Sequence, residues 1–455
     1  MEKLVFFHKT PALWNKAKHL SDEPKTIDLA KLGKKLPSFS LHSEMNDFFS
    51  TDVYVQMCKE ICAHLGIHEL HIVHGYREDE PRNWSVMDSQ GWCHVDENTT
   101  YWSLTDPVNL LPFMEAGLIL SRGNYPQLHN WLSRYSNNPS NQFWLHYPAT
   151  SIRFPHLEKY RKEIEGMVKS SGHSESIEST LTGMAIEHKL TYLSSTIAEK
   201  WTELLQHFQK QRTASMDGPY SMVLADDRFN VSALSEIFSS SMVQTFIKPA
   251  VYSNQEILHS KEYDLIYCGT TLQTTKNHQC FIQLLKHIDA LTSDDLTVAI
   301  AGNKKGNPLF ENLFSYPFSN IRLVNMGELP RSELQVLFSK TKTMIVTSGR
   351  DANPRIIQEC LVQGCRVLAV DTLSDGQEFI ESNPLLGTIL PSNSEKWTYE
   401  RNGNLVFHPS VKIASMVVEE IKKSNFPDLV ATIARKKLSV EQSVLPLIST
   451  ITSFR

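Results

Sequence analysis

An alternation of apolar segments with amphipathic segments between residues 263 and 371 constrains the fold most. The apolar segments are continuous, as strands covered on both faces are, and lie at 263–269, 296–302, 321–327, 342–349 and 365–371. The segments between them have helical period and lie at 277–288, 307–314, 332–341 and 354–364. This order predicts a parallel sheet with helices on both faces. In such sheets ligands bind beyond the carboxyl ends of the strands.

The first half of the chain shows a similar but less regular pattern. Strands are predicted at 4–8, 70–76, 117–123, 142–148, 220–226 and 243–249. Helices are predicted around 54–65, 125–135 and 230–239. Residues 77–105 are polar and aromatic without a period, which predicts a long loop. Residues 156–215 are rich in Glu, Lys, Ser and His and are expected to form an inserted helical arm or a mobile flap. The first half is therefore expected to be a second α/β domain.

The length of 455 residues suits two domains of roughly 200 residues better than one core. The two patterns meet between Pro249 and Lys261. We therefore expect an N-terminal domain over 1–250 and a C-terminal domain over 251–430.

Composition gives no overall indication of several classes of function. With 45 basic and 50 acidic residues the formal net charge is −5, which does not indicate binding to nucleic acid or to an anionic membrane. The seven cysteines are scattered, and no second pair completes a zinc site with Cys58 and Cys62, so structural thiols are expected. No run approaches the ~18 apolar residues of a membrane span. A cytoplasmic protein is expected, with peripheral membrane contact left open.

Two acidic residues stand near the predicted helix at 354–364. Pro354 suits the first helical position, because no amide hydrogen is needed there, and Gly364 suits the end. Glu359 lies about 60° from Ile356 on the helical wheel, at the edge of the apolar stripe. A carboxylate in that position needs a partner. Asp351 precedes the helix and either caps it or faces the crevice.

Spacing alone leaves two interpretations open for this acidic pair. In the structural one, Asp351 is a cap or first-turn acid and Glu359 reaches a lysine at the surface. In the functional one, both carboxylates contact a ligand at the carboxyl end of the sheet.

Five stretches resemble one enzyme family in content and order. They are Asp351-ANPRIIQ-Glu359, "GTTLQTTKN" (269–277), "IAGNKKGNPLFENLF" (300–314), "VNMGELPRSELQVLFSKTKTMIVTS" (324–348) and "QGCRVLAVDTLSDGQEFI" (363–380). Residues 263–380 thereby resemble the nucleotide-sugar domain of retaining GT-B glycosyltransferases of the group 1, family 4-like type. That group is typified by sucrose and glycogen synthases and bacterial mannosyltransferases.

The resemblance implies an architecture and an activity. The fold would be α/β, with two Rossmann-like domains facing a central cleft and residues 431–455 packing back towards the N-terminal domain as a helical segment. The enzyme would be a retaining hexosyltransferase that moves a sugar from a nucleotide-diphosphate sugar to an acceptor hydroxyl. It would need no metal and no cofactor besides this donor. The N-terminal domain would bind the acceptor, which is a glycan, lipid, protein or small molecule.

The resemblance also implies roles for residues of the acidic stretch. Glu359 would bind the ribose hydroxyls of the donor, and Asp351 would contact hydroxyls of its sugar. The backbone at Asn353 and Arg355, at the start of the helix, would hold the diphosphate. Lys276 would neutralise the charge that builds up on the leaving diphosphate.

Further donor contacts are implied at Gly269, Thr270 and Gly302, in the loops after the first two strands of this domain. His146 ends a predicted strand of the first half, where the family has a His or an acid near the donor sugar. A histidine satisfied in the core is the equal alternative there. His8 follows the first strand, where a solvated loop is expected.

The sequence departs from the family pattern in two places. Thr270 stands where the family has an arginine, and we expect Arg355 or Arg350 to replace that charge. The segment "FFHKTPALWNK" (6–16) replaces the Gly-Gly loop of the family. These departures support an alternative, in which the chain is a catalytically degenerate binding or scaffold protein on the same fold.

Overall fold

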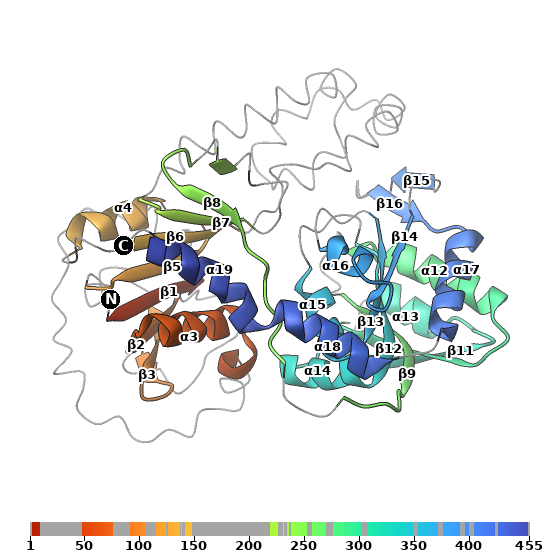
Figure 1. Cartoon of the computed structure of the whole chain (residues 1–455). Coiled ribbons are helices and arrows are strands. Elements are labelled where there is room, and N and C mark those ends of the chain that lie inside the picture. Colours follow the sequence, from red (N-terminus) through yellow and green to blue (C-terminus); the bar gives the residue numbers. More distant parts are fainter. Residues whose placement is uncertain are drawn as a thin grey trace, which may run out of the picture. The chain divides into compact units, whose positions relative to one another are not determined.

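Two parallel sheets organise the chain in the computed structural model (Figure 1). The structure describes residues 2–9, 48–75, 92–104, 115–123, 126–136, 138, 142–147, 219–225, 231, 234–235, 238–252, 257–269, 276–302, 308–348, 354–371, 376–391, 396–399, 405–423 and 426–453. These residues fall into an N-terminal unit, within 2–147, 219–249 and 440–453, and a C-terminal unit within 250–439.

The sheet of the N-terminal unit has eight strands within the described residues, in the order β3-β4-β2-β1-β5-β6-β7-β8. They are β1 (Lys3–Lys9), β2 (Glu69–Gly75), β3 (Trp92–His94), β4 (Thr99–Leu104), β5 (Leu118–Arg122), β6 (Gln142–Tyr147), β7 (Met222–Ala225) and β8 (Met242–Thr245). All neighbours pair in parallel except β3, which runs antiparallel to β4. β1 lies between β2 and β5, so the strand order reverses on either side of it.

One sequence prediction for this unit is wrong. The region predicted as a loop over 77–105 contains β3 and β4, and β4 extends the parallel sheet beyond β2. Consecutive residues of β4, Thr99, Thr100, Tyr101 and Trp102, are all buried, so its sequence shows no alternation of polar and apolar positions. The predicted arm at 156–215 and most of the predicted helix at 230–239 lie outside the described residues.

Counted over the described residues, the sheet of the C-terminal unit has six parallel strands in the order β11-β10-β9-β12-β13-β14. They are β9 (Tyr263–Cys268), β10 (Leu296–Ala301), β11 (Ile321–Gly327), β12 (Thr341–Val346), β13 (Arg366–Val370) and β14 (Gly387–Leu390). This is the doubly wound order of dinucleotide-binding folds, in which the direction of winding reverses between the first and fourth strands. The reversal here lies between β9 and β12. A separate hairpin pairs β15 (Lys396–Tyr399) with β16 (Leu405–His408).

Helices cover both faces of this sheet, as the sequence predicts. They are α12 (His278–Leu291), α13 (Pro308–Phe314), α14 (Arg331–Ser339), α15 (Arg355–Leu361), α16 (Gln377–Glu381), α17 (Val411–Lys422) and α18 (Pro427–Leu438). α12, α13 and α17 lie on one face and α14, α15 and α18 on the other (Figure 1). Residues of β9 alternate between the two cores, with Leu265 and Tyr267 in one and Ile266 in the other.

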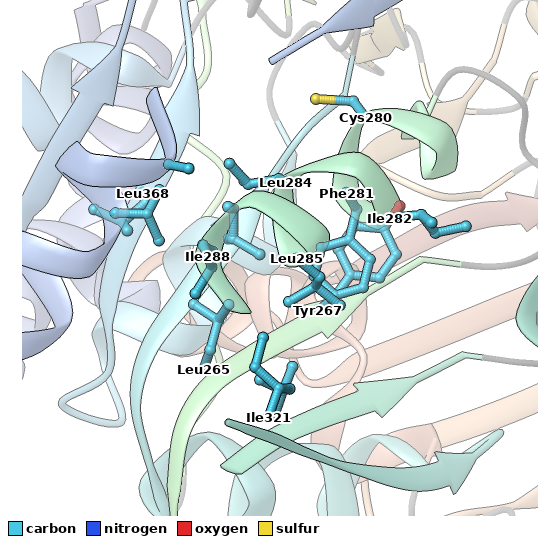
Figure 2. Packing of buried hydrophobic residues seen from close by; sticks show 14 of the residues in the cluster. Leu265, Tyr267, Cys280, Phe281, Ile282, Leu284, Leu285, Ile288, Ile321 and Leu368 are labelled. Carbon is cyan, nitrogen blue, oxygen red and sulfur yellow. The ribbon is translucent and has the colours of Figure 1, made fainter. Parts of the chain in front are cut away.

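The core under α12 is aromatic at its centre. Figure 2 shows Phe281 and Leu285 of α12 against Tyr267 of β9. The rings of Tyr267 and Phe281 stack with centroids 3.9 Å apart and an angle of 7° between their planes. Large buried rings of this kind contribute strongly to core stability, and they fix α12 against the end of β9.

The N-terminal unit carries α3 (Val53–Leu65), α4 (Pro126–Tyr135) and α19 (Val440–Ser453). α19 comes from the end of the chain and packs against α3. Thr450 of α19 lies 3.5 Å from the side-chain oxygen of Gln244 in β8. The last described helix is therefore an integral part of the N-terminal unit.

A buried ion pair at the amino end of β13 makes the stability of the C-terminal unit pH-dependent. Arg366 lies 2.9 Å from the carboxylate of Glu420, and both residues are 6% exposed. Burial raises the pKa of Glu420, but hydrogen bonds from Lys423, Thr388 and Arg366 outweigh it and hold the pKa below its ordinary value. A carboxyl whose pKa is lowered on folding stabilises the folded state above its unfolded pKa, and this contribution disappears as the pH falls through the folded pKa.

We therefore expect Glu420→Gln to lower the free energy of unfolding by about 1–3 kcal/mol at pH 7. The difference from the wild type should shrink as the pH falls below the ordinary range of a glutamate. Urea denaturation at a series of pH values from 7 to 3 measures it. If the two proteins differ in the free energy of unfolding by the same amount at every pH in this range, the lowered pKa of Glu420 is contradicted.

Candidate functional site

The carboxyl ends of β9 and β12 flank the point where the winding of the C-terminal sheet reverses. Gly269 follows β9, and Thr347 and Ser348 follow β12. All three are buried. Open α/β sheets bind ligands in the crevice at such a point, so this edge of the sheet is the candidate binding site.

Lys276 is the first residue of the described segment 276–302. Its backbone is held by Tyr267 of β9 and by Thr347, which follows β12. The hydroxyl of Tyr267, in β9, lies 3.2 Å from the carbonyl oxygen of Lys276, and the hydroxyl of Thr347 donates to the same oxygen at 3.0 Å. Thr347 also lies 3.3 Å from the carbonyl oxygen of Asn277. Burial raises the pKa of Tyr267, so this phenol stays neutral and keeps its hydrogen. These contacts fix the backbone that carries Lys276.

Asn277 makes the turn from this segment into α12. Its φ is 54° and its ψ is 55°, which asparagine tolerates better than most residues. The side chain is only 5% exposed, and neither its oxygen nor its nitrogen has a hydrogen-bonding partner within the described part of the chain. A buried amide without partners at a helix start is typical of a place where a ligand or water supplies them.

Gly269 is held close to the same turn. A Cβ atom added there would lie 3.1 Å from Cε1 of His278 and 3.3 Å from the hydroxyl of Tyr267. Both distances are tighter than ordinary carbon contacts, so a side chain at this position would push His278 away. Glycine therefore lets the end of β9 approach the start of α12.

Glu359 lies on the other side of the end of β9. It is 6% exposed, and its carboxylate accepts a hydrogen bond from Arg331 at the start of α14. Cys268 is the last residue of β9, and the pKa of its thiol is raised. Burial is the main cause, and electrostatic repulsion from Cys365 and from the carboxylate of Glu359 adds to the increase. The buried carboxylate thus has the partner that its position demands, and it stands beside the carboxyl end of β9.

The loops after β10 and β11 meet at two glycines. Gly302 has a φ of 81° and donates from its amide to the carbonyl of Gly327 at 2.7 Å. Gly327 has a φ of 64°, and its amide donates a hydrogen bond to the side-chain oxygen of Asn325 at 3.0 Å. Both glycines occupy a backbone region that disfavours side chains. Gly302 is therefore a turn residue at the same edge of the sheet.

The structure brings together some of the predicted residues and not others. Gly269, Lys276, Gly302 and Glu359 all belong to the carboxyl edge of the C-terminal sheet. Asp351, Asn353 and Thr270 lie outside the described residues, as does Arg350. Arg355 is the first residue of α15 and is half-buried. Its suggested role in place of the family arginine stays a prediction.

His146 belongs to the N-terminal unit and is completely buried at the end of β6. Its ring centroid lies 5.1 Å from that of Tyr54 and 5.8 Å from that of Phe246. This position matches the core alternative at least as well as a role near a donor sugar, which stays a prediction. The solvated loop predicted at His8 is wrong, because this residue is in β1 and is 8% exposed.

Sequence reasoning missed Arg331 and Thr347. Arg331 lies inside the quoted stretch 324–348, directly after Pro330, but nothing in its spacing relates it to Glu359 28 residues later. Thr347 directly follows the apolar strand β12, so its hydroxyl at the carboxyl end of a strand is visible in the sequence alone. Its contact with the Lys276 carbonyl forms only when the segment after β12 meets the segment before α12, and the pattern of apolar residues in the sequence does not predict that meeting.

The described residues also bear on metal binding, on the state of the cysteines and on membrane-spanning helices. No three His, Cys, Asp or Glu side chains among them come together as a metal site. The six cysteines whose side chains are described are free thiols, and burial raises the pKa of Cys62 to about 12. Within the same residues, no helix is long and apolar enough to span a lipid bilayer.

Comparison with known proteins identifies the fold. HepE of Anabaena, whose crystal structure contains UDP and glucose, aligns over 100% of both chains with 10% identity and a TM-score of 0.52. A sucrose-phosphate synthase from Thermosynechococcus elongatus aligns over 100% of this chain and 99% of its own, with 11% identity and a TM-score of 0.49. A glycosyltransferase from Rickettsia africae aligns over 99% and 98%, with 10% identity and a TM-score of 0.48. No protein-family model and no curated protein matches the chain.

The chain therefore has the GT-B fold, with one Rossmann-like sheet in each unit. The resemblance seen in the motifs of the C-terminal half is confirmed at this level. At about 10% identity the likeness defines architecture, and activity has to be argued from the site.

Proposed function

We propose that the protein is a glycosyltransferase that moves a sugar from a nucleotide-diphosphate sugar to an acceptor hydroxyl, with retention of configuration and without a metal ion. The observation that carries the proposal is the convergence of Lys276, the start of α12 and the buried carboxylate of Glu359 on the end of β9. A cation, a helix start and a carboxylate are the groups that a diphosphate and a ribose require.

The donor would lie across the winding reversal of the C-terminal sheet. Lys276 would face the diphosphate and stabilise the charge that develops as the bond to the sugar breaks. Its backbone is fixed by Tyr267 and Thr347, so little reorganisation is needed during the reaction. Glu359 would accept hydrogen bonds from the ribose hydroxyls, with Arg331 holding the carboxylate in place. Asp351 would contact the sugar, as the family resemblance implies.

The proposal is tested by turnover of UDP-, GDP-, ADP- and dTDP-sugars with a panel of hydroxyl acceptors. We expect release of one nucleoside diphosphate, unaffected by a metal chelator, and a product with the anomeric configuration of the donor by proton NMR. Loss of turnover with the chelator would contradict the metal-free part, and an inverted product the retaining part. Binding of a nucleotide sugar without turnover of any acceptor would favour the scaffold alternative.

The replacement of the family arginine by Thr270 gives a separate prediction. If Arg355 supplies the missing charge, Arg355→Ala should weaken donor binding about tenfold, the effect of one charge-assisted hydrogen bond. Arg350→Ala tests the other candidate. The dissociation constant of the donor from isothermal titration measures both. If neither substitution changes it, neither arginine replaces the missing one.

A further inference from the structure

The amino edge of the C-terminal sheet carries a cavity that is separate from the proposed donor site. Its volume is about 280 Å³, close to the lower end of the range for pockets that bind small molecules. Side chains from β13, from the segment before β14, from the end of α17 and from the start of α18 line it, and they are Arg366, Pro384, Leu385, Lys423, Phe426 and Val430. All of them belong to the C-terminal unit, so the cavity is formed within one compact unit.

Arg366 gives this cavity a fixed wall. Its guanidinium is buried, and Nε donates to the carbonyl oxygen of Leu385 and Nη2 to that of Pro384, both at 3.2 Å. Nη1 donates to the carbonyl oxygen of Glu420 at 3.3 Å, and Nη2 also donates to the carboxylate of Glu420 at 2.9 Å. These hydrogen bonds tie the segment before β14 and the end of α17 to the start of β13. The wall is therefore formed before any ligand binds, as is usual for small-molecule sites.

The charged groups of the lining are positive. Arg366 and Lys423 both line the cavity, and no acidic side chain of the described residues does. Both cations pair with one carboxylate, since Oε2 of Glu420 contacts Arg366 and its Oε1 contacts Lys423. Asp428, the acid in the first turn of α18, lies outside the lining and pairs with His259 at 3.0 Å. Two cations thus share one carboxylate, and the positive charge that remains favours an anionic ligand.

The remaining lining is apolar and partly open to water. Val430 is completely buried, whereas Phe426 keeps 52% of its surface exposed. The carbonyl oxygen of Phe426 accepts a hydrogen bond from the amide of Val430 at 3.0 Å, in the first turn of α18. The backbone of Phe426 is thereby fixed, and its ring stays at the opening of the cavity. An aromatic ring that is half in water is stabilised when an apolar group covers it.

We propose that this cavity binds a small carboxylate that carries an apolar chain. The chain lies against Leu385 and Val430, and the ring of Phe426 covers it. The carboxylate pairs with the ammonium of Lys423, whose side chain is 56% exposed, so the charged head stays partly in water. Partial solvation avoids the free energy that complete burial of a charge requires. The site lies at the amino ends of the strands and does not depend on the proposed glycosyl transfer.

The same lining disfavours other classes of ligand. A nucleotide sugar is too large for a cavity of about 280 Å³. A free phosphate would match the positive charge but would leave the ring of Phe426 in water. An amine would be repelled by Arg366 and Lys423, and an uncharged apolar molecule would gain nothing from them. The combination of a single negative charge and an apolar chain matches both parts of the lining.

The first test uses the wild-type chain and probes of equal length. Methyl NMR titrations of protein labelled at leucine and valine measure the dissociation constants of octanoate, octanol and octylamine. Octanoate should shift the methyl resonances of Leu385 and Val430 and bind roughly tenfold more tightly than octanol, the effect of one charge-assisted contact. Octylamine should bind more weakly than octanol. Each methylene removed from octanoate should weaken binding about fourfold. Equal affinity for octanoate and octanol, or no binding of octanoate at millimolar concentration, would overturn the proposal.

Two pairs of variants then locate the binding. Leu385→Trp fills the cavity and should weaken octanoate binding at least tenfold, whereas Leu429→Trp should not, because Leu429 is exposed on α18 and does not line the cavity. Lys423→Met should lower the affinity for octanoate to that for octanol. Lys422→Met is its control, because this ammonium pairs with Asp294 at 2.8 Å outside the lining. Wild-type affinity in both Leu385→Trp and Lys423→Met would mean that octanoate binds elsewhere. The comparison of probes on the wild type decides the point even if Leu385→Trp does not fold.

A competition experiment separates this site from the proposed donor site. Saturating UDP-, GDP-, ADP- or dTDP-sugar should leave the titration with octanoate unchanged, because the two sites lie at opposite ends of the strands. Mutual exclusion of octanoate and a nucleotide sugar would overturn a separate site. Sedimentation with vesicles of phosphatidylcholine and phosphatidylserine should leave the protein in the supernatant. Cosedimentation that Phe426→Ala abolishes would assign this ring to a membrane surface and overturn the proposal. Octanoate binding without binding of any nucleotide sugar would contradict the proposed function alone.

Discussion

Lys276→Met is expected to lower kcat for transfer by roughly 10²- to 10³-fold, the usual effect of removing one preorganised donor from a developing negative charge. The methionine preserves the length and apolar part of the side chain, and it leaves the backbone contacts of residue 276 with Tyr267 and Thr347 in place. The loss should appear mainly in kcat, because charge on the diphosphate increases as the bond to the sugar breaks.

Lys286→Met is the matched control, because Lys286 lies on α12, the helix that follows Lys276, but at the surface. Its ammonium is 4.5 Å from the ring centroid of Tyr316, an exposed contact of small energy. Steady-state kinetics should show this variant close to the wild type. Equal losses in both variants would mean that general positive charge matters and that Lys276 has no special position.

Glu359→Ala is expected to weaken donor binding by about 2–4 kcal/mol, or roughly 30- to 700-fold in dissociation constant, since two hydrogen bonds from ribose hydroxyls to a carboxylate are lost. The structure adds a reason for a strong effect, because the carboxylate is buried and already oriented by Arg331. Little side-chain freedom remains to be lost when the nucleotide binds.

Glu420→Gln serves as the control for a buried carboxylate paired with an arginine. Glu420 pairs with Arg366 at the amino end of β13, the edge opposite to the site. It should lower stability without changing donor affinity. Isothermal titration at a temperature where both variants are folded separates the two effects. Unchanged donor affinity in Glu359→Ala would leave Glu359 as a purely structural partner of Arg331.

Most strands of the two sheets could be predicted from the sequence, because strands buried on both faces consist of continuous apolar residues. Each predicted strand of the C-terminal half overlaps one of β9 to β13, where continuous apolar runs mark strands covered on both faces. β4 is hard to predict because its buried residues include Thr99 and Thr100, which are polar. The order of the strands is a tertiary property, and only the motifs of the family resemblance indicated it.

The candidate sites were predictable only where local sequence carried them. Glu359 is predictable because a carboxylate at the edge of an apolar stripe needs a partner. Its partner Arg331 is distant in sequence, and the pair forms only when α14 and α15 lie side by side. The cavity beside Arg366 likewise combines side chains that are distant in sequence, from β13 to α18. Sites of this kind become visible once β13 and α18 have been placed.

The measurement that tests the central claim most directly is the shift in melting temperature with UDP-, GDP-, ADP- and dTDP-sugars, for the wild type and Glu359→Ala. The account predicts that one nucleotide stabilises the wild type, by about 2.7 kcal/mol at a hundred times its dissociation constant, and that Glu359→Ala abolishes most of this stabilisation. No stabilisation by any of the four at millimolar concentration would contradict a donor site at the end of β9.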